Sequence, residues 1–377
     1  MLVEITKDTL IKAVQHVIKA VAASNHPLPL LRGIHIQAHK DGLFLTASNT
    51  SMTVQSMIPS DGISIKIEST GSVVIPSRYF YDVIRKLHSE SIKLEMLENS
   101  ILTVMSGHFR ISLCGMDPAD FPTIPDRERH SSGIKLRISN AMFKSTIKQT
   151  AIVASTSEAR PVLNGVSLAC LNNSLNLTAT DGVRLASRTI HIENEANHRF
   201  NAIIPAKNLY EISTMLSDGD EPTEIAVRDN RIQFSTHGLK VESALIDGIF
   251  PPVNNLIPQA YQCEISVDKR GLLTAVECAC VLANACIIKM SAAADKLQII
   301  SKTAEIGEVE NEVPLIEMKG KEFIFSLNGK YLIDILRNMD TASVQIRYSG
   351  NNSPIVVLPS NSSMNTLYLI TPVRTHH

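Results

Sequence analysis

The chain repeats itself, and this repetition restricts its fold more than any other feature of its 377 residues. Three segments share one pattern: an apolar residue that ends a strand, a polar cluster able to cap a helix, and an apolar residue five positions on. These segments begin at Ile5, Ile138 and Val267, at nearly equal intervals along the chain. A pattern that recurs at nearly constant spacing indicates that one structural unit is copied along the chain.

Two further motifs repeat in step with the first. Residues 75–83 match residues 204–212 at the same interval that separates Ile138 from Val267, and residues 327–335 follow at a slightly shorter one. Phe121-Pro122 and Phe250-Pro251 also match at this interval. The repetition predicts three copies of one domain, separated by stretches that contain proline, with boundaries at 1–128, 129–258 and 259–377.

Each copy is expected to combine two helices with many short strands, which is an α+β architecture. Alternating apolar residues predict strands with one buried face, as at 43–46, 92–96 and 101–104. Apolar stripes at helical spacing predict the buried side of the first helix in two copies. The stripe in the first copy is Leu10, Ala13, Val14, Val17 and Val21, and in the second Phe143, Ile147, Thr150 and Ala154.

One turn is notable for the motifs that accompany it. Asp181-Gly182 follows an alternating segment and predicts a turn, because glycine adopts backbone angles that other residues avoid. Taken alone, the segment 179–188 is typical of a hairpin with an exposed arginine. Its companions are RPVLNGV at 160–166, DGIFPP at 247–252 and ITPVR at 370–374. In this order the motifs resemble the bacterial DNA polymerase III beta subunit, the replicative sliding clamp, from Met1 to Thr375.

The resemblance implies three tandem DNA-clamp domains, with antiparallel sheets outside and two helices per domain inside. It implies that two chains close head to tail into a homodimeric ring around duplex DNA. Such a ring tethers the replicative polymerase for processive synthesis, without catalysis and without a cofactor. Polymerase and clamp-loader subunits would bind it through hydrophobic peptide motifs. A specialised second clamp and a protein-binding repeat scaffold remain alternative hypotheses.

The polar faces of the helices support two interpretations. Triplets such as Arg78-Asp82-Arg85 and Lys330-Asp334-Arg337 are spaced for intrahelical ion pairs on solvated faces. Their repetition in different copies favours one shared basic surface instead. By resemblance this surface contacts DNA phosphates without reading the base sequence. Its candidate residues are Lys12, His16, Lys19, Arg78, Lys144, Lys148, Lys207, Lys330 and Arg337.

The same resemblance places a peptide-binding cleft between the second and third domains. By position the cleft comprises Leu163, Thr180, Gly182, Val183, Arg184, Leu185, Pro251, Asn255, Leu256, Ile370, Thr371, Pro372, Val373 and Arg374. Arg184 and Arg374 are expected to offer donors at its rim. Val183, Asn255 and Thr371 replace residues that are often His, Arg and Met or Leu in the family, so we expect weaker peptide binding than is typical.

Two segments of opposite charge predict how the copies join. Residues 107–113 are basic, and residues 305–312 alternate acidic with apolar side chains, so their edges can pair with each other but not with themselves. By resemblance Val281 and Leu282 complete a small apolar core there. The expected interface residues are His108, Arg110, Ile111, Leu113, Val281, Leu282, Glu308, Glu310 and Glu312.

Composition and motif searches disfavour several other classes of protein. The chain lacks a run of about 18 apolar residues and a secretory signal, so it is expected to be cytoplasmic. A formal net charge of −1 argues against a protein that coats DNA through its overall charge, but is compatible with basic residues gathered on one surface. An acid–base enzyme built on Asp181 or Asp247 is disfavoured, because both aspartates precede glycine in turns and no phosphate loop, nucleophile elbow or carboxylate pair accompanies them.

The cysteines and histidines carry no pattern of a metal site. The histidines show no spacing typical of metal ligands, and the six cysteines lie among apolar neighbours. We therefore expect no metal and small, buried, reduced thiols. His376-His377 lies past the usual end of the family and is either an extension or part of a purification tag.

Overall fold

The computed structural model describes residues 1–96, 100–122, 124, 134–192, 199–228, 230–303, 307–360 and 365–374. The chain forms two compact units. Unit 1 comprises Met1–Ala141 and Thr214–Leu245, and unit 2 comprises Met142–Ser213 and Ile246–His377. The domain boundary expected at 128–129 and the terminal His376-His377 lie outside the described residues.

Unit 1 contains two antiparallel sheets. The smaller sheet has the order β5 (Ile65–Ser69), β1 (Leu2–Thr6), β7 (Ser91–Met96), β8 (Ile101–Ser106) and β9 (Phe109–Cys114). The larger has the order β10 (Ile134–Ser139), β15 (Pro222–Arg228), β16 (Arg231–Thr236), β17 (Leu239–Ala244), β4 (Met52–Pro59), β3 (Gly42–Ser48), β2 (Gly33–His39) and β6 (Gly71–Pro76). Pairing of β17 with β4 makes one sheet from strands that are far apart in the sequence.

Unit 2 contains one sheet of twelve strands, which are also antiparallel. Its order is β14 (Phe200–Pro205), β11 (Gly165–Leu171), β12 (Ser174–Thr180), β13 (Arg184–His191), β25 (Asn365–Ile370), β24 (Ile355–Pro359), β23 (Ser343–Tyr348), β18 (Cys263–Asp268), β21 (Gly307–Gly320), β20 (Lys296–Thr303), β19 (Ile287–Ala293) and β22 (Phe323–Asn328). Strand β21 is unusual because it pairs with β20 over Gly307–Pro314 and with β18 over Leu315–Gly320. Here again one pair, β13 with β25, joins distant parts of the chain.

The helices begin where the repeat predicts them. Helices α1 (Lys7–Val17), α3 (Asn140–Ala151) and α5 (Lys269–Leu282) each start directly after one of the three strand-ending segments. Helices α2 (Ser77–Lys86), α4 (Ala206–Met215) and α6 (Gly329–Asn338) each start within a copy of the second motif. Short 3₁₀ turns are η1 (Ile18–Ala20), η2 (Pro29–Arg32), η4 (Pro161–Asn164), η5 (Asn254–Leu256) and η6 (Asn284–Cys286). Among the described helices, none has the length and hydropathy needed to cross a membrane.

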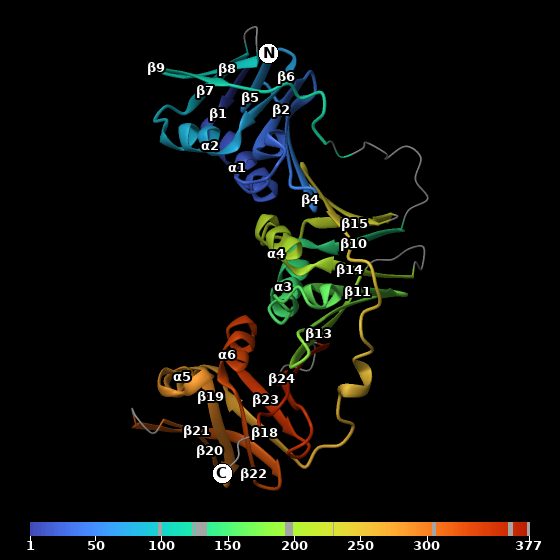
Figure 1. Ribbon diagram of the computed structural model, residues 1–377, viewed down its shortest axis with the longest axis vertical. Coiled ribbons are helices and arrows are strands. Elements are labelled where there is room, and N and C mark those ends of the chain that lie inside the picture. Colours follow the sequence, from blue (N-terminus) through green and yellow to red (C-terminus); the bar gives the residue numbers. More distant parts are fainter. Residues whose placement is uncertain are drawn as a thin grey trace. The chain divides into compact units, whose positions relative to one another are not determined.

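Local sequence explains how these helices start and which face they bury. The Asp268 carboxylate accepts from the Gly271 amide at the start of α5, and the Asn328 side chain accepts from the Lys330 amide in α6. The predicted stripe of α1 is buried except for Val21, which lies beyond the helix end. Ala154 likewise lies beyond α3. In unit 2, α5 packs against α6 and against β20 and β21 (Figure 1).

The cysteines differ from the expectation of buried, reduced thiols. Cys280 and Cys286 form a disulfide. Cys114 and Cys278 are exposed, whereas Cys170 and Cys263 are buried, which raises the pKa of both thiols. The expectation failed for the disulfide pair because a chain reversal after α5 brings together two residues whose meeting the local sequence does not reveal.

Candidate functional site

The turn between β12 and β13 is held by side chains of its own residues. The Asp181 Oδ1 atom accepts from the amides of Val183 and Arg184, both at 2.9 Å. The Thr180 hydroxyl donates to the Arg184 carbonyl at 2.7 Å and accepts from the Gly182 amide at 3.1 Å. Gly182 has φ 94°, which explains why glycine stands there. The turn is therefore a rigid element with an outward-facing Val183, whose exposure is 43%.

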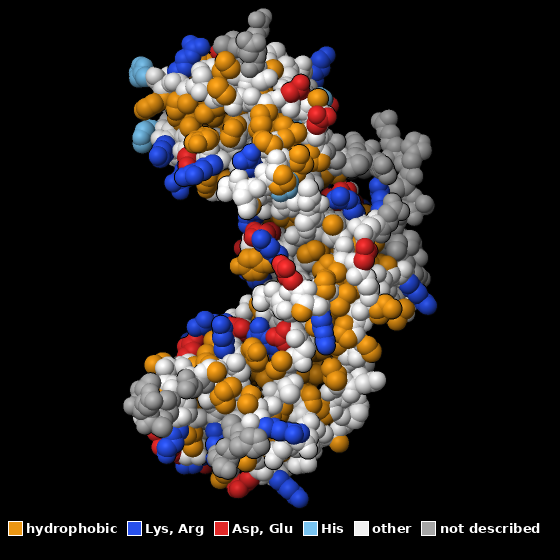
Figure 2. All heavy atoms as spheres, viewed as in Figure 1, with side chains coloured by type: hydrophobic (Ala, Val, Ile, Leu, Met, Phe, Trp, Pro, Cys, Tyr) orange, Lys and Arg blue, Asp and Glu red, His pale blue; other side chains and the backbone are white. Residues whose placement is uncertain are grey.

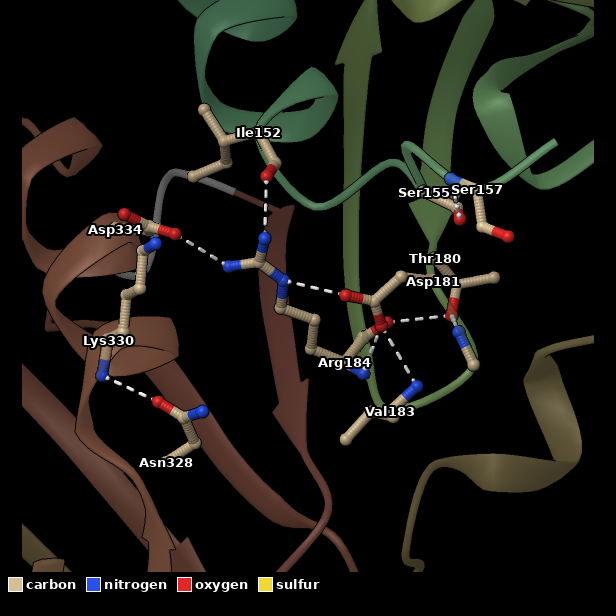
Figure 3. Close-up of polar contacts among 11 residues, drawn as sticks. Ile152, Ser155, Ser157, Thr180, Asp181, Val183, Arg184, Asn328, Lys330 and Asp334 are labelled. Atoms are coloured by element: carbon tan, nitrogen blue, oxygen red, sulfur yellow. Dashed lines mark hydrogen bonds and ion pairs between the residues drawn. The ribbon is translucent and has the colours of Figure 1, made fainter. Parts of the chain in front are cut away.

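Arg184 braces this turn against helix α6 and against the residue that follows α3. Its Nε atom donates to Asp181 Oδ2 at 3.0 Å, and its two terminal nitrogens donate to Asp334 Oδ2 at 2.8 Å and to the Ile152 carbonyl at 3.1 Å (Figure 3). The guanidinium also lies over the Tyr331 ring, 4.5 Å from its centroid. With 11% of its side chain exposed, Arg184 is not the rim donor that the sequence suggested. Its role is internal, because its guanidinium forms an ion pair with Asp334 in α6.

The C-terminal tail lies beside the turn. Strand β25 pairs with β13 so that Ile370 lies opposite Arg184. The Thr371 amide then donates to the Val183 carbonyl at 2.9 Å, and the Val373 amide donates to the Ser326 carbonyl of β22 at 2.7 Å. Arg374 donates to Asn352 Oδ1 at 3.3 Å. The tail is thus fixed at both ends, against the turn and against the edge of β22.

An apolar cluster lies next to this turn and tail. Its buried members are Leu185, Val356 and Leu369, and five partly buried side chains pack against them, namely Val253, Ile257, Tyr261, Leu358 and Leu367. Sequence reasoning named only Leu185 of these eight residues. The alternation at 365–370 was the available signal, because it places Leu367 and Leu369 on one face of a strand.

The other expected cleft residues fall into two groups. Leu163, Thr180 and Ile370 are buried, and Pro372 and Val373 are partly buried. The exposed members are Gly182, Pro251, Asn255, Leu256, Thr371 and Arg374. Leu256 lies in η5, three residues after Val253, whose carbonyl accepts from the Leu256 amide. Ile249 is 91% exposed in the neighbouring linker and was not among the expected residues.

The expected basic surface is mostly exposed. Lys12, Arg78, Lys148, Lys207, Lys330 and Arg337 are exposed, whereas His16, Lys19 and Lys144 are partly buried. Burial, and secondarily the charge of Lys19, lowers the pKa of His16, so His16 is neutral near pH 7. Figure 2 shows Lys and Arg side chains over α2 in unit 1, and mixed basic and acidic side chains over α5 and α6 in unit 2.

The acidic residues of α5 and α6 do not follow the intrahelical pairing that the charge triplets suggested. Arg337 pairs with Glu277 of α5 at 2.8 Å, and Asp334 pairs with Arg184. Both partners come from other elements, because α6 packs closely against α5 and the β12–β13 turn reaches it. The interpretation of Lys330-Asp334-Arg337 as one ion-paired helix face was therefore wrong for its acidic member.

The segments expected to join two copies are exposed edges. Strand β9 is the last strand of its sheet, and none of its residues is buried. Val281 is 80% exposed, and among the described strands Glu308–Val313 of β21 pairs on the β20 side alone. The acidic residues of β21 are partly compensated within the chain, since Glu308 pairs with Lys302 at 3.3 Å and Glu312 with Lys296 at 2.5 Å, and Gln298 donates to Glu310.

The contacts of Asp181 give little support to catalytic chemistry at this candidate aspartate. The Asp181 carboxylate is fully engaged in the turn and with Arg184. Within the described parts of the chain, no group of three or more His, Cys, Asp or Glu side chains could hold a metal ion. The arrangement is that of a binding surface: a rigid turn, a fixed tail and an apolar cluster.

Family models match nearly the whole chain in three consecutive parts. The N-terminal domain of the DNA polymerase III beta subunit matches residues 1–125, its central domain 137–252, and its C-terminal domain 254–374. The chain belongs to the DNA polymerase III beta subunit family. It therefore consists of three tandem clamp domains, and the resemblance noted from the sequence motifs is confirmed.

Individual relatives agree with this assignment. The chain is 32% identical over 379 residues to the beta sliding clamp of Bacillus subtilis, and 34% identical over 378 residues to that of Staphylococcus aureus strain Mu50. Each match covers 99% of this chain and 99% of the relative. The crystal structure of the DNA polymerase sliding clamp from Bacillus subtilis superposes with a TM-score of 0.93 at 33% identity, covering 100% of both chains. As a member of the beta subunit family the chain is a non-catalytic processivity factor, which excludes the acid–base enzyme considered for Asp181 or Asp247.

Proposed function

We propose that two copies of this chain join head to tail into a ring that encircles duplex DNA and holds the replicative polymerase on its template. The chain would act in the cytoplasm, where the bacterial chromosome lies. The single observation that carries the partner-binding half of this proposal is the tail fixed beside the β12–β13 turn. Two backbone hydrogen bonds, Thr371 to Val183 and Val373 to Ser326, place a proline-containing segment next to an apolar cluster.

We expect this place to bind the hydrophobic peptide motifs of polymerase and clamp-loader subunits. The amides of Gly182, Val183 and Arg184 already have acceptors within the turn, so a peptide finds few free donors there. Exposed apolar side chains surround the turn instead, with Val183 at 43% and Leu256 at 52% exposure. Recognition would rest on burial of leucine or phenylalanine anchors.

We expect the DNA contact to be electrostatic and independent of sequence. Exposed cations occur on α1, α2, α3, α4 and α6, namely Lys12, Arg78, Lys148, Lys207, Lys330 and Arg337. Dispersed phosphate contacts of this kind weaken steeply as salt rises, because DNA binding releases condensed counterions. His16, being neutral near pH 7, and Arg337, being paired with Glu277, would contribute less.

Retention on circular DNA tests the ring. The protein is loaded onto nicked circular DNA with a clamp loader and passed through a sizing column at increasing salt. We expect it to stay with the circle and to leave after the DNA is linearised, because a ring is held by topology rather than by affinity. Replacement of Lys12, Lys148 and Lys207 by Gln should reduce loading. The matched control replaces Lys40, Lys66 and Lys319 by Gln, which makes the same charge change at exposed sites outside the helices and should leave loading unchanged. Equal retention on linear and circular DNA would contradict the proposal.

The interface and the cleft are tested separately from DNA. Ile111→Asp with Leu113→Asp should give monomers in analytical ultracentrifugation, while Ile63→Asp, at a 90% exposed turn position, should leave the dimer intact. Deletion of residues 371–377 should abolish binding of a polymerase-type hydrophobic peptide in calorimetry, whereas deletion of 375–377 alone should not. A dimer that survives both aspartates, or peptide affinity that survives the longer deletion, would refute the corresponding site.

A further inference from the structure

The disulfide of unit 2 closes the chain reversal that follows α5. Cys280 lies in the last turn of that helix, and Cys286 is the last residue of η6, with 4.8 Å between their Cα atoms. Between them the chain passes through Ala285 at φ 50°, and Cys286 itself has φ 59°. Residues other than glycine avoid this left-handed region, so the reversal requires something to hold it. The disulfide is the covalent link that does so.

The bonded pair lies directly beside an exposed apolar residue. Val281 follows Cys280 and is 80% exposed, and Leu282, next along, is partly buried. On its other side Cys280 packs against Gly329 at the start of α6. The contact is so close that a Cβ atom added at Gly329 would lie 2.5 Å from the Cys280 sulfur. The position of Cys280 is therefore fixed by α6, and the disulfide extends that constraint to the reversal that carries Val281 and Leu282.

We infer that Cys280 and Cys286 form a reversible dithiol–disulfide site that controls how firmly a second copy docks on Val281 and Leu282. This inference rests on the proposed function, since it assumes that the apolar pair belongs to the ring interface. A disulfide within a bacterial cytoplasm is more often a redox-sensing bond than a permanent one, because thiol systems keep that compartment reducing.

The chemistry is a thiol–disulfide exchange with a small disulfide such as oxidised glutathione. One protein thiolate attacks the small disulfide, forms a mixed disulfide and releases one small thiol. The second protein thiolate then attacks the mixed disulfide, which closes the Cys280–Cys286 bond and releases the other small thiol. The two protein thiols lose two protons and two electrons, and the small disulfide is reduced to two thiols.

Oxidation is expected to favour the dimer. With the bond closed, the reversal is held in its left-handed backbone conformation and the apolar pair has one fixed geometry. With the bond open, Ala285 and Cys286 can relax, and docking must then order the reversal as well as bury Val281. A preordered surface binds more tightly because it loses less conformational freedom on binding.

The test uses Cys278→Ser as the parent, because Cys278 is an exposed thiol close enough in sequence to confuse the assignment. The protein is equilibrated with dithiothreitol or with oxidised glutathione, denatured, and labelled with a maleimide for mass spectrometry. We expect two fewer labelled cysteines after oxidation, both on the peptide that contains residues 280 and 286. An unchanged label count would overturn the dithiol site, whatever the oligomeric state.

Subunit exchange between fluorescently labelled dimers then measures the consequence. We expect exchange to be about threefold or more slower after oxidation, and to be insensitive to redox state in Cys280→Ser with Cys286→Ser. Cys286→Ser alone serves if the double variant does not fold. A disulfide that forms without changing exchange would overturn the control of docking. If neither the oxidised nor the reduced form dimerises, the proposed ring is refuted, and the label count still decides the redox site.

Discussion

The turn between β3 and β4 in unit 1 and the turn between β12 and β13 in unit 2 occupy equivalent places in the repeat. In unit 1 the Asn49 side chain accepts from the Met52 amide at 2.9 Å, and the Ala244 amide donates to the Ser51 carbonyl at 2.8 Å. In unit 2 Asp181 accepts from the Arg184 amide, and the Thr371 amide donates to the Val183 carbonyl, both at 2.9 Å. The two backbones are held in the same way.

The side chains of the two turns differ at the equivalent positions Met52 and Arg184. Met52 is 1% exposed and belongs to the apolar core, whereas Arg184 is held by two carboxylates and a carbonyl. Outside, Ser51 of unit 1 corresponds to the exposed Val183 of unit 2. The repeat thus supplies the scaffold, and a charged brace under an apolar tip distinguishes the turn that we assign to partner binding. Four experiments would break or sharpen this comparison.

The largest effect is expected for Met52→Arg, which transplants the arginine without Asp181 and Asp334. The site buries its side chain almost completely, so the introduced guanidinium would lose its hydration, and unfolding of unit 1 should become easier by about 4 kcal/mol. Denaturant unfolding followed by hydrogen exchange of β4 measures this change. Met52→Leu is the control and should cost less than about 1.5 kcal/mol. Wild-type stability in Met52→Arg would mean that the two turns are interchangeable.

The reverse change, Arg184→Met, should be the next largest. It leaves Asp181 and Asp334 without their cation, which we expect to cost about 2 kcal/mol, less than for a fully buried pair because Asp334 is 32% exposed. Peptide affinity should fall about tenfold, because the turn loses its brace against α6. Calorimetry on both properties checks this, with Arg184→Lys expected between the two. Unchanged peptide affinity would show that the contacts of Arg184 do not support peptide binding.

Acid should destabilise unit 1 more than unit 2, because the two units differ at another pair of equivalent positions. In unit 1 His35 Nε2 lies 2.5 Å from the Ser72 hydroxyl. The equivalent residues of unit 2 are Ser167 and Asn201, and the Ser167 hydroxyl donates to Asn201 Oδ1 at 3.1 Å. Burial lowers the pKa of His35 from 6.5 to about 4, so the native state holds it neutral while the unfolded chain binds a proton below pH 6.5. The stability of unit 1 is therefore complete above pH 6.5 and is lost as the pH falls toward 4, by about 2 kcal/mol at pH 5.

Hydrogen exchange of β2 and β11 at pH 7 and pH 5, corrected for intrinsic rates, measures this difference within one molecule. His35→Gln should remove the extra acid sensitivity of β2 and leave β11 unchanged. Equal acid sensitivity of both strands in the wild type would show that the histidine does not control it.

The smallest effect is expected from restoring family residues at the cleft. Asn255→Arg with Thr371→Met should tighten peptide binding by about threefold to tenfold, because both positions are exposed and a larger side chain can cover an apolar anchor. Isothermal titration with one hydrophobic peptide measures the gain, and Thr371→Ser should leave affinity near the wild-type value. Weaker binding in the double variant would indicate that the cleft of this chain is adapted to a different partner.

Sequence predicted the parts of the fold that depend on neighbouring residues. The starts of α1, α3 and α5 followed from polar clusters and apolar spacing, and those of α2, α4 and α6 followed from the repeat. Asp181-Gly182 identified its turn, because turn signals are local. The resemblance then located the tail beside that turn. Pairing over long distances was not predictable in this way: Arg184 meets Asp334 from a distant part of the sequence, and Cys280 meets Cys286 through a reversal with no glycine. Both depend on how finished elements pack.

Strand β21 has a mechanical consequence. Its first half is bonded to β20 and its second half to β18, with Pro314 at the change of partner. A force along the strand at Glu308–Val313 would act in shear on the hydrogen bonds of both ladders, β21 with β20 and β21 with β18. Hydrogen bonds loaded in shear resist as a group and do not open one at a time. Tension at that edge would therefore pass through β18, β23 and β24 into β25, the strand whose end lies against Val183.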